Sequence, residues 1–385
     1  MFFKQKTIPY GKQSVSWGDI WEVVKTLRSN NLTQGPKIKE FEDALCAYTG
    51  AKYAVALSNG TAALHLATLA LDITEGDQGI TTPITFLASA NCMLYAGGSV
   101  TFADIEKNTA NINPEEIEKK ITSQTKVLIP VHFAGQSCDM REISRIAKKH
   151  NLFVIEDAAH AIGSKYNDTM VGSCKYSDMT IFSFHPVKTI TTGEGGVITT
   201  NNKDLYEKLL ILRTIGVTRD PARLTQNDGP WFYQMHDLGF NYRMTDMQAA
   251  LGISQLRRLD SFVQRRREIV QSYRAAFAHD PRFALLEEKA FSQAAFHLCP
   301  LLINFDIVKT DKTQLFEKLK SRGLYLQVHY IPVHTQPYYK KLGFKEGDYP
   351  VSEQYYRSTL SLPLYPLLKD YEVKNIIQII KEIVR

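Results

Sequence analysis

Residues 179–200 have the sequence MTIFSFHPVKTITTGEGGVITT. Both ends of this stretch are apolar and β-branched, which predicts two short buried strands, the first ending near Ser183 and the second starting at Val197. Lys188 lies in the Gly-rich loop between them. Because the flanking strands draw this loop into the interior, a lysine that only improves solubility is not expected there. The position of Lys188 indicates a chemical role.

A carboxylate follows the preceding predicted strand. Residues 152–161 read LFVIEDAAHA, an apolar run that puts Asp157 at the carboxyl end of a strand, where open α/β sheets bind ligands. A lysine and an aspartate at that edge fit pyridoxal 5'-phosphate, with the lysine bonded covalently to the cofactor and the aspartate keeping the pyridine nitrogen protonated. An isolated pair of this kind is more often a surface lysine and a helix-capping aspartate than a cofactor site. The neighbouring motifs therefore decide between the two interpretations.

The length of the chain indicates two domains, and its cysteine pattern indicates neither disulfides nor a metal site. The chain has 385 residues, and we expect residues 1–255 to form a large domain and residues 256–385 a smaller one. The five cysteines are scattered, with no CxxC pair and no metal-ligand spacing, so no metal site is predicted. The start lacks the pattern of a signal peptide, and no apolar run is long enough to span a bilayer. We therefore expect a cytoplasmic protein without a membrane partner.

The charge of the chain does not require a nucleic-acid partner. The formal net charge of +6 is modest for this length. The basic cluster 265–267, with Arg257 and Arg258 at helical spacing, is typical of a solvated helix face. Anionic small molecules explain the charge equally well, so no nucleic-acid partner is predicted.

Strands alternate with helices through the first two thirds of the chain, which predicts a mostly parallel sheet covered on both faces. No GxGxxG follows the first strand, so a dinucleotide fold is not supported. Beyond a long helix the pattern changes to that of a small α+β domain with an antiparallel sheet. The expected strands are 53–58, 80–83, 100–105, 126–131, 296–305 and 323–328, and the expected helices include one from Ile20 capped by Asp19, 139–150, 204–213, 246–273 capped by Thr245 or Asp246, 312–321 and 373–384.

The first strand ends in a turn typical of an anion site. Ser58-Asn59-Gly60-Thr61 leads into an apolar helix, so the N–H groups of Thr61 and Ala62 and the Thr61 hydroxyl can bind a phosphate. An ordinary helix cap is equally consistent with this turn. The next strand is followed by Phe86, an aromatic that suits either a flat cofactor ring or the core.

Three further polar segments can contact a ligand. The turn 32–35 is either free to face a ligand or a plain interhelical loop, and the long polar loop 216–239 is either functional or flexible. The extended stretch HYIPVH, residues 329–334, has two histidines whose spacing does not fit a helical zinc motif. It predicts ligand contacts or a packed pair.

Four motifs resemble the DegT/DnrJ/EryC1/StrS family of sugar aminotransferases, in family order along nearly the whole chain. They are SNGTAALHLA (58–67), EDAAHA (156–161), SFHPVKTITTGEGG (183–196) and LGFNYRMTDMQAALG (238–252). The resemblance implies an α/β type I fold, a homodimer and pyridoxal phosphate covalently held by Lys188, with Asp157 beside the ring nitrogen. It further implies phosphate contacts from Thr61, Ala62 and Ser183, ring neighbours Phe86 and His160, and a phosphate contact from Asn241 of the opposite subunit. Some family members have histidine in place of the lysine and dehydrate their sugar, so the presence of Lys188 implies transamination.

Four loops look like a narrower branch of this family, the C4-aminotransferases of pseudaminic acid biosynthesis. The loops are IPYGKQ (8–13), LTQGP (32–36), HYIPVHTQPYY (329–339) and SLPLYP (361–366). This resemblance implies a UDP-linked 4-keto-6-deoxy-N-acetylhexosamine as substrate and glutamate as amino donor. The implied sugar contacts are Tyr10, Leu32, Thr33, Gln34, Ser58, His329, Tyr330 and His334.

Other activities also fit the same motifs. They are amination of dTDP-4-keto-6-deoxyglucose or a UDP-4-keto-pentose, a lysine-assisted dehydratase or epimerase, and a non-catalytic sugar-binding relative. Lys188 and Asp157 both argue against the last of these. The sequence does not identify the group that binds the donor carboxylate, for which Arg243 is one of several arginines.

Overall fold

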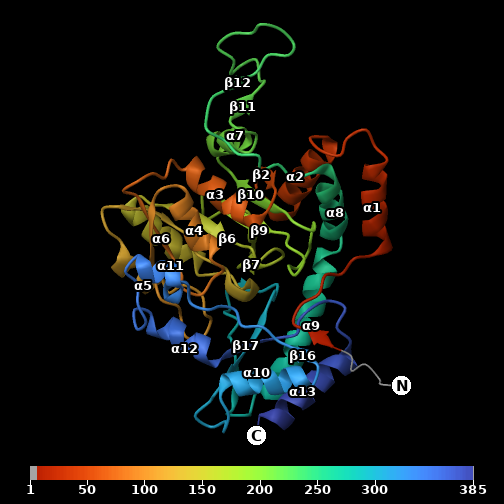
Figure 1. The fold of residues 1–385 in the computed structure, drawn as a ribbon, viewed down its shortest axis with the longest axis vertical. Coiled ribbons are helices and arrows are strands. Elements are labelled where there is room, and N and C mark those ends of the chain that lie inside the picture. The colour runs from red at the N-terminus through yellow and green to blue at the C-terminus, as the bar shows by residue number, and fades with distance from the viewer. Residues whose placement is uncertain (1–6, 385) are drawn as a thin grey trace.

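A computed structural model describes residues 7–384, and its centre is a seven-stranded sheet (Figure 1). The strand order is β2-β10-β9-β6-β5-β3-β4, and only β10 runs antiparallel to its neighbours. The expected mostly parallel α/β sheet is therefore confirmed. The strands are β2 (Tyr53–Leu57), β10 (Gly196–Thr200), β9 (Met179–Ser183), β6 (Phe153–Asp157), β5 (Thr125–Leu128), β3 (Gln78–Thr81) and β4 (Ser99–Phe102).

Helices cover both faces of this sheet because successive strand residues point to opposite sides. Val55 and Leu57 pack with α3 (Gly60–Ala70), α4 (Ala88–Tyr95) and α7 (Lys203–Leu212). Ala54 and Ala56 pack with α2 (Pro36–Thr49) and α8 (Asp246–Leu256) on the other face. A further apolar cluster joins the sheet to α5 (Pro114–Lys120) and α6 (Met140–His150). The strand ends of the sheet are therefore held rigidly from two sides.

Two predicted helix boundaries are wrong. The single helix expected from Asp246 to Tyr273 is two helices, α8 and α9 (Leu259–Phe277), with a break at Arg257 and Arg258. Arg258 binds Asp19 at this break, with 2.6 Å between Nη1 and Oδ2. Asp19 is also not the cap of α1 (Trp17–Leu27), because Ser16 is the cap and Asp19 completes its capping box. The cap of α8 is Thr245, one of the two residues predicted for it.

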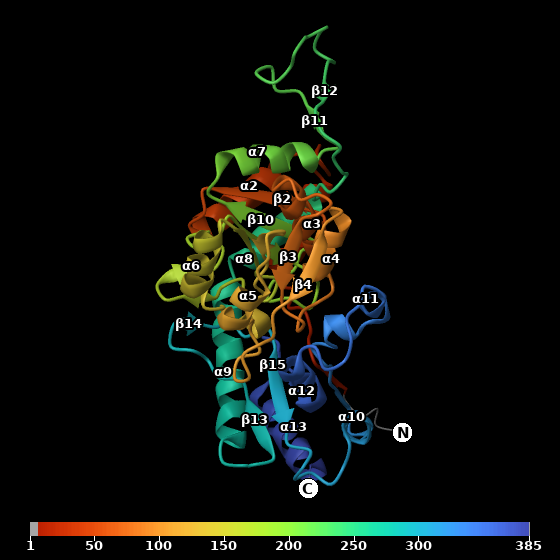
Figure 2. The same ribbon diagram turned by 90° about the vertical axis from the view of Figure 1, so that its left-hand side faces the viewer.

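The helices and strands of the C-terminal third lie together at the lower end of the molecule (Figure 2). They build a second apolar core. This core contains α9, α10 (Lys312–Ser321), α13 (Asp370–Ile383) and the antiparallel sheet β13-β15-β17, formed by β13 (Phe283–Leu285), β15 (Cys299–Ile303) and β17 (Thr359–Leu362). The strand expected at 323–328 is shorter than predicted, and it contacts this sheet through an isolated antiparallel bridge between Gln327 and Ser361. Its regular part, β16 (Leu324–Tyr325), pairs in parallel with β1 (Ile8–Pro9), so the N-terminal segment is held against the C-terminal part. The domain boundary at residue 255 stays a prediction.

The remaining elements are short. They are β7 (Lys165–Tyr166), β8 (Thr169–Met170) and β14 (Ser292–Gln293) in one small sheet, β11 (Val217–Thr218) with β12 (Gln234–Met235), the 3-10 turns η1 (Phe133–Gly135) and η2 (Val333–Thr335), α11 (Pro337–Lys341) and α12 (Pro350–Ser358). The hairpin β11–β12 projects from the body at the end distant from the C-terminus (Figures 1 and 2). No helix within residues 7–384 is long and apolar enough to cross a membrane.

The basic cluster on α9 is not the solvated face that its spacing predicts. Arg266 is 1% exposed, and its Nη1 donates to the backbone oxygens of Phe296, His297 and Leu364. Arg265 and Arg267 instead form ion pairs with carboxylates. Within the cluster, Arg266 thus serves internal packing, because α9 packs against two apolar cores, whereas Arg265 and Arg267 form ion pairs on partly exposed parts of the helix.

Candidate active site

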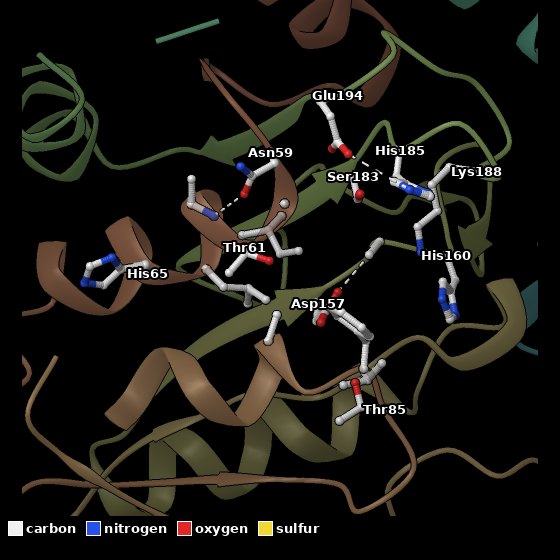
Figure 3. A pocket seen from close by; sticks show the side chains of 18 of the residues that line it. Asn59, Thr61, His65, Thr85, Asp157, His160, Ser183, His185, Lys188 and Glu194 are labelled. Atoms are coloured by element: carbon white, nitrogen blue, oxygen red, sulfur yellow. Dashed lines mark hydrogen bonds and ion pairs between the residues drawn. The ribbon is translucent and has the colours of Figure 1, made fainter. Parts of the chain in front are cut away.

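A cavity of about 860 Å³ lies at the carboxyl ends of the parallel strands (Figure 3). Its wall includes Asp157 from the end of β6, Ser183 from the end of β9 and Thr61 from the first turn of α3. Residues from the C-terminal third, among them His297 and His329, complete it. The cavity therefore forms where α/β sheets ordinarily bind ligands, and its volume is within the range of small-molecule sites.

Lys188 enters this cavity from the loop between β9 and β10 (Figure 3). The loop is fixed by its own backbone, since the Lys188 N–H donates to His185 O at 2.9 Å and the Thr192 N–H to Phe184 O at 3.0 Å. The side chain is half-buried, and its amine makes no hydrogen bond or ion pair with any residue in 7–384. Burial lowers the pKa of Lys188 to about 8, while the Asp157 carboxylate opposes that shift. An appreciable fraction of this amine is neutral near physiological pH, as a nucleophile or base requires.

Asp157 is buried and held at both carboxylate oxygens. Oδ2 accepts a hydrogen bond from Ser89 Oγ at 2.5 Å, and Oδ1 accepts one from the Ala159 N–H at 3.0 Å. Its backbone N–H donates to Pro130 O at 2.9 Å. The carboxylate is therefore oriented by the protein before any ligand arrives.

Three buried histidines line the cavity beside Lys188: His160, His297 and His329. Burial lowers the pKa of each, and the positive charge of Lys188 acts in the same direction; for His329 the pKa falls to about 3. His160 Nε2 lies 3.0 Å from Tyr330 OH, and its ring centroid lies 4.6 Å from that of His297. These imidazoles are neutral at physiological pH, so they offer hydrogen bonds without adding charge.

The amino end of α3 forms an open anion site. Asn59 Oδ1 accepts the Ala62 N–H at 2.8 Å, so this N–H is already used by a helix cap. The N–H groups of Gly60 and Thr61 and the Thr61 hydroxyl have no partner in the described chain. A Cβ at Gly60 would lie 2.9 Å from Ser183 Cβ, so only glycine allows β9 to approach this turn. Free N–H groups at a helix start suit a phosphate.

The groups around the cavity fit pyridoxal 5'-phosphate. The open end of α3 suits its phosphate, the Asp157 carboxylate suits its ring nitrogen, and the Lys188 amine suits its aldehyde carbon. In addition, Nδ1 of His160 and Nδ1 of His297 are buried without a hydrogen-bond partner. Because buried polar groups are normally paired, these two nitrogens leave hydrogen-bonding capacity unused beside the cavity, which is compatible with a bound polar molecule.

The cavity brings together ten of the residues singled out from the sequence: Tyr10, Thr61, Ala62, Phe86, Asp157, His160, Ser183, Lys188, His329 and Tyr330. Six others lie outside its wall: Leu32, Thr33, Gln34, Ser58, Asn241 and His334. Tyr330 uses its hydroxyl on His160, and the Phe86 ring remains 58% exposed. The lysine, aspartate and helix turn thus converge as predicted, whereas the sugar-contact set does not converge within one chain.

The six outlying residues have different surroundings. Thr33 forms a backbone bridge with Thr245, and Asn241 is exposed and bridges Thr214. His334 is fully buried, and its Nε2 lies 3.0 Å from Glu353 Oε1. The expectation that His334 contacts the sugar is corrected, because its imidazole is enclosed by packing away from the cavity.

Several cavity residues were not foreseen from the sequence: Asn59, His65, Thr85, Tyr95, His185, Glu194, Phe240, Tyr242 and His297. The signal for His297 is a histidine inside the apolar run 294–298. For Thr85 and for Ser89, which contacts it, the signal is that they are polar residues following an expected strand. No arginine among the described residues lines the cavity, and Arg243 instead forms a backbone bridge with Leu57.

Comparison of the sequence with known proteins gives matches along almost the whole chain. The pattern of the DegT/DnrJ/EryC1/StrS aminotransferase family matches residues 17–381. The spore coat polysaccharide biosynthesis protein SpsC of Bacillus subtilis is 41% identical over 380 residues, which are 98% of this chain and 97% of that protein. The UDP-4-amino-4,6-dideoxy-N-acetyl-beta-L-altrosamine transaminase of Campylobacter jejuni is 41% identical over 361 residues, which are 93% and 92% of the two chains.

Solved structures show the same architecture. PseC of Helicobacter pylori, an aminotransferase involved in the biosynthesis of pseudoaminic acid, matches with a TM-score of 0.91 and 32% identity over 98% of this chain and 99% of its own. Spr1654 of Streptococcus pneumoniae, in its PMP form, matches with a TM-score of 0.92 and 33% identity over 98% of this chain and 99% of its own. The shared fold therefore extends over 98% of this chain.

Proposed function

The chain belongs to the DegT/DnrJ/EryC1/StrS aminotransferase family, and we propose that it transfers an amino group from glutamate to C4 of a UDP-linked 4-keto-6-deoxy-N-acetylhexosamine. Its cofactor is pyridoxal 5'-phosphate, for which we propose a covalent bond to Lys188. The observation that carries this proposal is the unpartnered Lys188 amine, with a pKa of about 8, in one cavity with the oriented Asp157 carboxylate.

Bound pyridoxal phosphate supplies a conjugated ring that takes up the electron pair left when the donor loses its α-proton. Lys188, once the incoming amino group of the donor has displaced it from the cofactor, would act as the base that takes up and returns this proton, and in the second half-reaction it would move a proton in the reverse direction. Its lowered pKa suits both directions near neutral pH. The lysine therefore ends each catalytic cycle in its starting protonation state.

Asp157 and the start of α3 hold the two polar ends of the cofactor. Asp157 presents negative charge where the ring nitrogen needs it, and Ser89 and Ala159 keep that charge in place. The N–H groups of Gly60 and Thr61 bind the phosphate. Because these groups are oriented in advance, little reorganisation accompanies the reaction.

The substrate part of the proposal rests on the named relatives and on one wall of the cavity. Tyr10, His329 and Tyr330 form this wall, and the Tyr10 backbone is fixed by the hydrogen bond from Leu364 N–H to Tyr10 O at 2.9 Å. Such groups suit a hydroxylated, N-acetylated sugar. A sugar without the N-acetyl carbonyl would lose a hydrogen-bond acceptor toward this wall, and a site built to bond such a group discriminates against analogues that lack it.

We further propose a homodimer whose two cavities are each completed by the partner chain. Asn241 is exposed and lies outside the cavity of its own chain. Thr33, in the turn 32–34, forms a backbone bridge with Thr245, which follows Asn241 by four residues. The face of α1 also carries exposed apolar side chains, with Trp17 84% and Trp21 54% exposed. Exposed apolar faces of this kind mark protein interfaces. Contacts from Leu32, Thr33 and Gln34 would then be made in the partner's cavity.

The deciding experiment compares three ketosugars under identical conditions. Purified enzyme, pyridoxal phosphate and glutamate are incubated with UDP-2-acetamido-2,6-dideoxy-4-ketohexose, with dTDP-4-keto-6-deoxyglucose and with a UDP-4-keto-pentose, and the products are identified by mass and NMR. We expect amination at C4 of the first sugar and poor use of the other two. Lys188→Ala protein and a reaction without glutamate are the controls. Faster amination of either other sugar would overturn the substrate assignment while leaving the aminotransferase class intact.

A further inference from the structure

A second buried carboxylate lies directly before Asp157, on the opposite face of β6. Because successive strand residues alternate in direction, Asp157 faces the cavity while Glu156 points away from it. Glu156 is 5% exposed, and its Oε2 lies 2.7 Å from His132 Nε2. Its Oε1 accepts hydrogen bonds from Ser177 and, at 3.1 Å, from Thr180. This network does not line the cavity and has no part in the mechanism described above.

The tautomer of His132 follows from its backbone partner. The Cys138 N–H donates to His132 Nδ1 at 3.1 Å, and a backbone N–H can only donate, so Nδ1 must be the unprotonated nitrogen. The ring proton is therefore on Nε2, from which it is donated to Glu156. Burial raises the pKa of Glu156, but the hydrogen bonds from His132, Ser177 and Thr180 outweigh it and hold the pKa below its usual value. His132 is thus a neutral donor to a charged carboxylate.

The same histidine also holds the backbone of Asp157. The His132 N–H donates to Asp157 O at 3.0 Å, and the Asp157 N–H donates to Pro130 O at 2.9 Å. His132 therefore binds two consecutive residues of β6, Glu156 through its ring and Asp157 through its backbone. Rotation of the strand end would break both contacts together.

We propose that His132 is a positioning residue for the reaction: its double contact with Glu156 and Asp157 fixes the direction in which the Asp157 carboxylate meets the cofactor ring nitrogen. The proposal rests on the function proposed above for Asp157. His132 touches neither substrate nor cofactor, so its effect is transmitted only through the end of β6.

Two substitutions separate the ring contact from the rest of the side chain. His132→Asn keeps an acceptor near the Nδ1 position for the Cys138 N–H but is too short to reach Glu156. His132→Gln places an amide N–H near the Nε2 position and keeps the bond to Glu156. The matched control is His334→Asn, because His334 is an equally buried histidine bonded to a glutamate, Glu353, outside the cavity.

Three readouts are measured on each variant: kcat and KM with the ketosugar, the thermal unfolding midpoint, and the pH at which the visible absorbance of the bound cofactor titrates. We expect His132→Asn to lower kcat about 10- to 100-fold with little change in KM, because a small misorientation of a catalytic group has an effect of this size. The absorbance titration should shift as well, and His132→Gln should restore both. His334→Asn should lower the unfolding midpoint similarly but leave kcat and the titration unchanged.

The His334→Asn control distinguishes a positioning role of His132 from a purely structural one. If His132→Asn lowers only the unfolding midpoint, as His334→Asn does, or if His132→Gln is as impaired as His132→Asn, the positioning role is overturned. Should His132→Asn not fold, Ser177→Ala loosens Glu156 from its other oxygen and must shift kcat and the titration in the same direction by a smaller factor. An Asp157→Asn protein with an unchanged titration would instead reject the role of Asp157 itself.

Discussion

Ser89 donates a hydrogen bond to Asp157 across 2.5 Å between Oγ and Oδ2, joining residues that are 68 positions apart in the sequence. Ser89 belongs to α4 and Asp157 ends β6. The Thr85 hydroxyl lies 2.6 Å from Ser89 Oγ and continues the chain of hydrogen bonds to the cavity wall. Asp157, which we propose contacts the cofactor, is therefore oriented by a serine of α4, a helix that packs against the sheet.

This relationship predicts a graded effect of two substitutions. Ser89→Ala should lower kcat about 10- to 100-fold, because a hydrogen bond to a buried charged group contributes about 1.5–3 kcal/mol. Thr85→Val, one bond farther from the carboxylate, should have a smaller effect. Steady-state rates with saturating glutamate and ketosugar measure both. Equal rates for Ser89→Ala and the unchanged enzyme would show that Asp157 is oriented by other contacts.

Replacing Lys188 tests the central assignment. Lys188→Ala should abolish the visible absorbance of covalently bound cofactor and lower turnover by at least about 10²- to 10⁴-fold, the usual contribution of a general base. Far-ultraviolet circular dichroism should remain unchanged, since the amine makes no hydrogen bond within residues 7–384. Lys175→Ala, at an exposed lysine, is the control. A fully active Lys188→Ala enzyme would refute the reading of this site.

The pKa of Lys188 predicts the pH dependence of cofactor attachment. Only the neutral amine attacks the aldehyde carbon, and burial lowers the Lys188 pKa from 10.5 to about 8. The rate at which apo-enzyme takes up pyridoxal phosphate should therefore rise with pH, with a midpoint of about 8, and level off above it. Rapid-mixing absorbance between about pH 6 and 10 measures this midpoint. A midpoint near the value of a free lysine would mean that the amine is solvated.

Asp157→Asn removes the negative charge that the cofactor nitrogen requires. We expect turnover to fall by orders of magnitude while the cofactor stays bound, because the start of α3 still binds the phosphate. The same substitution should lower the midpoint pH of pyridoxal phosphate uptake, because the Asp157 charge raises the pKa of Lys188. Dialysis of the loaded protein and steady-state rates report the two effects. Turnover at the rate of the unchanged enzyme would reduce Asp157 to a structural residue.

Subunit mixing tests the shared cavity. Lys188→Ala and Asn241→Ala homodimers should each be impaired, whereas a heterodimer contains one cavity in which both residues are unchanged. Unfolding and refolding the two proteins together, with different affinity tags to isolate the heterodimer, should restore a substantial fraction of the activity per cavity. No recovery in isolated heterodimers would indicate that Asn241 acts within its own chain. An active monomer would exclude sharing altogether.

The alternation of apolar strands and helices was enough to predict the mostly parallel sheet. Those patterns depend on local periodicity, which the chain carries in contiguous residues. The same reasoning placed Asp157 and Lys188 at one edge of the sheet, because parallel strands end on a common side. It failed at the break between α8 and α9, where the pattern continues but Arg258 is drawn to Asp19 from a distant segment.

The orientation of the side chains in the cavity was decided only by the tertiary structure. Whether Asp157 is held by Ser89, whether His160 meets Tyr330 and His297, and whether His334 reaches the cavity depend on how distant segments pack. The protonation of Lys188 was also decided by the tertiary structure, since its lowered pKa comes from burial in a cavity lined by distant segments of the chain. The sequence by itself determined which chemical groups this protein brings to the strand ends. Packing decided their partners and protonation, because burial and hydrogen-bond geometry are properties of the folded chain.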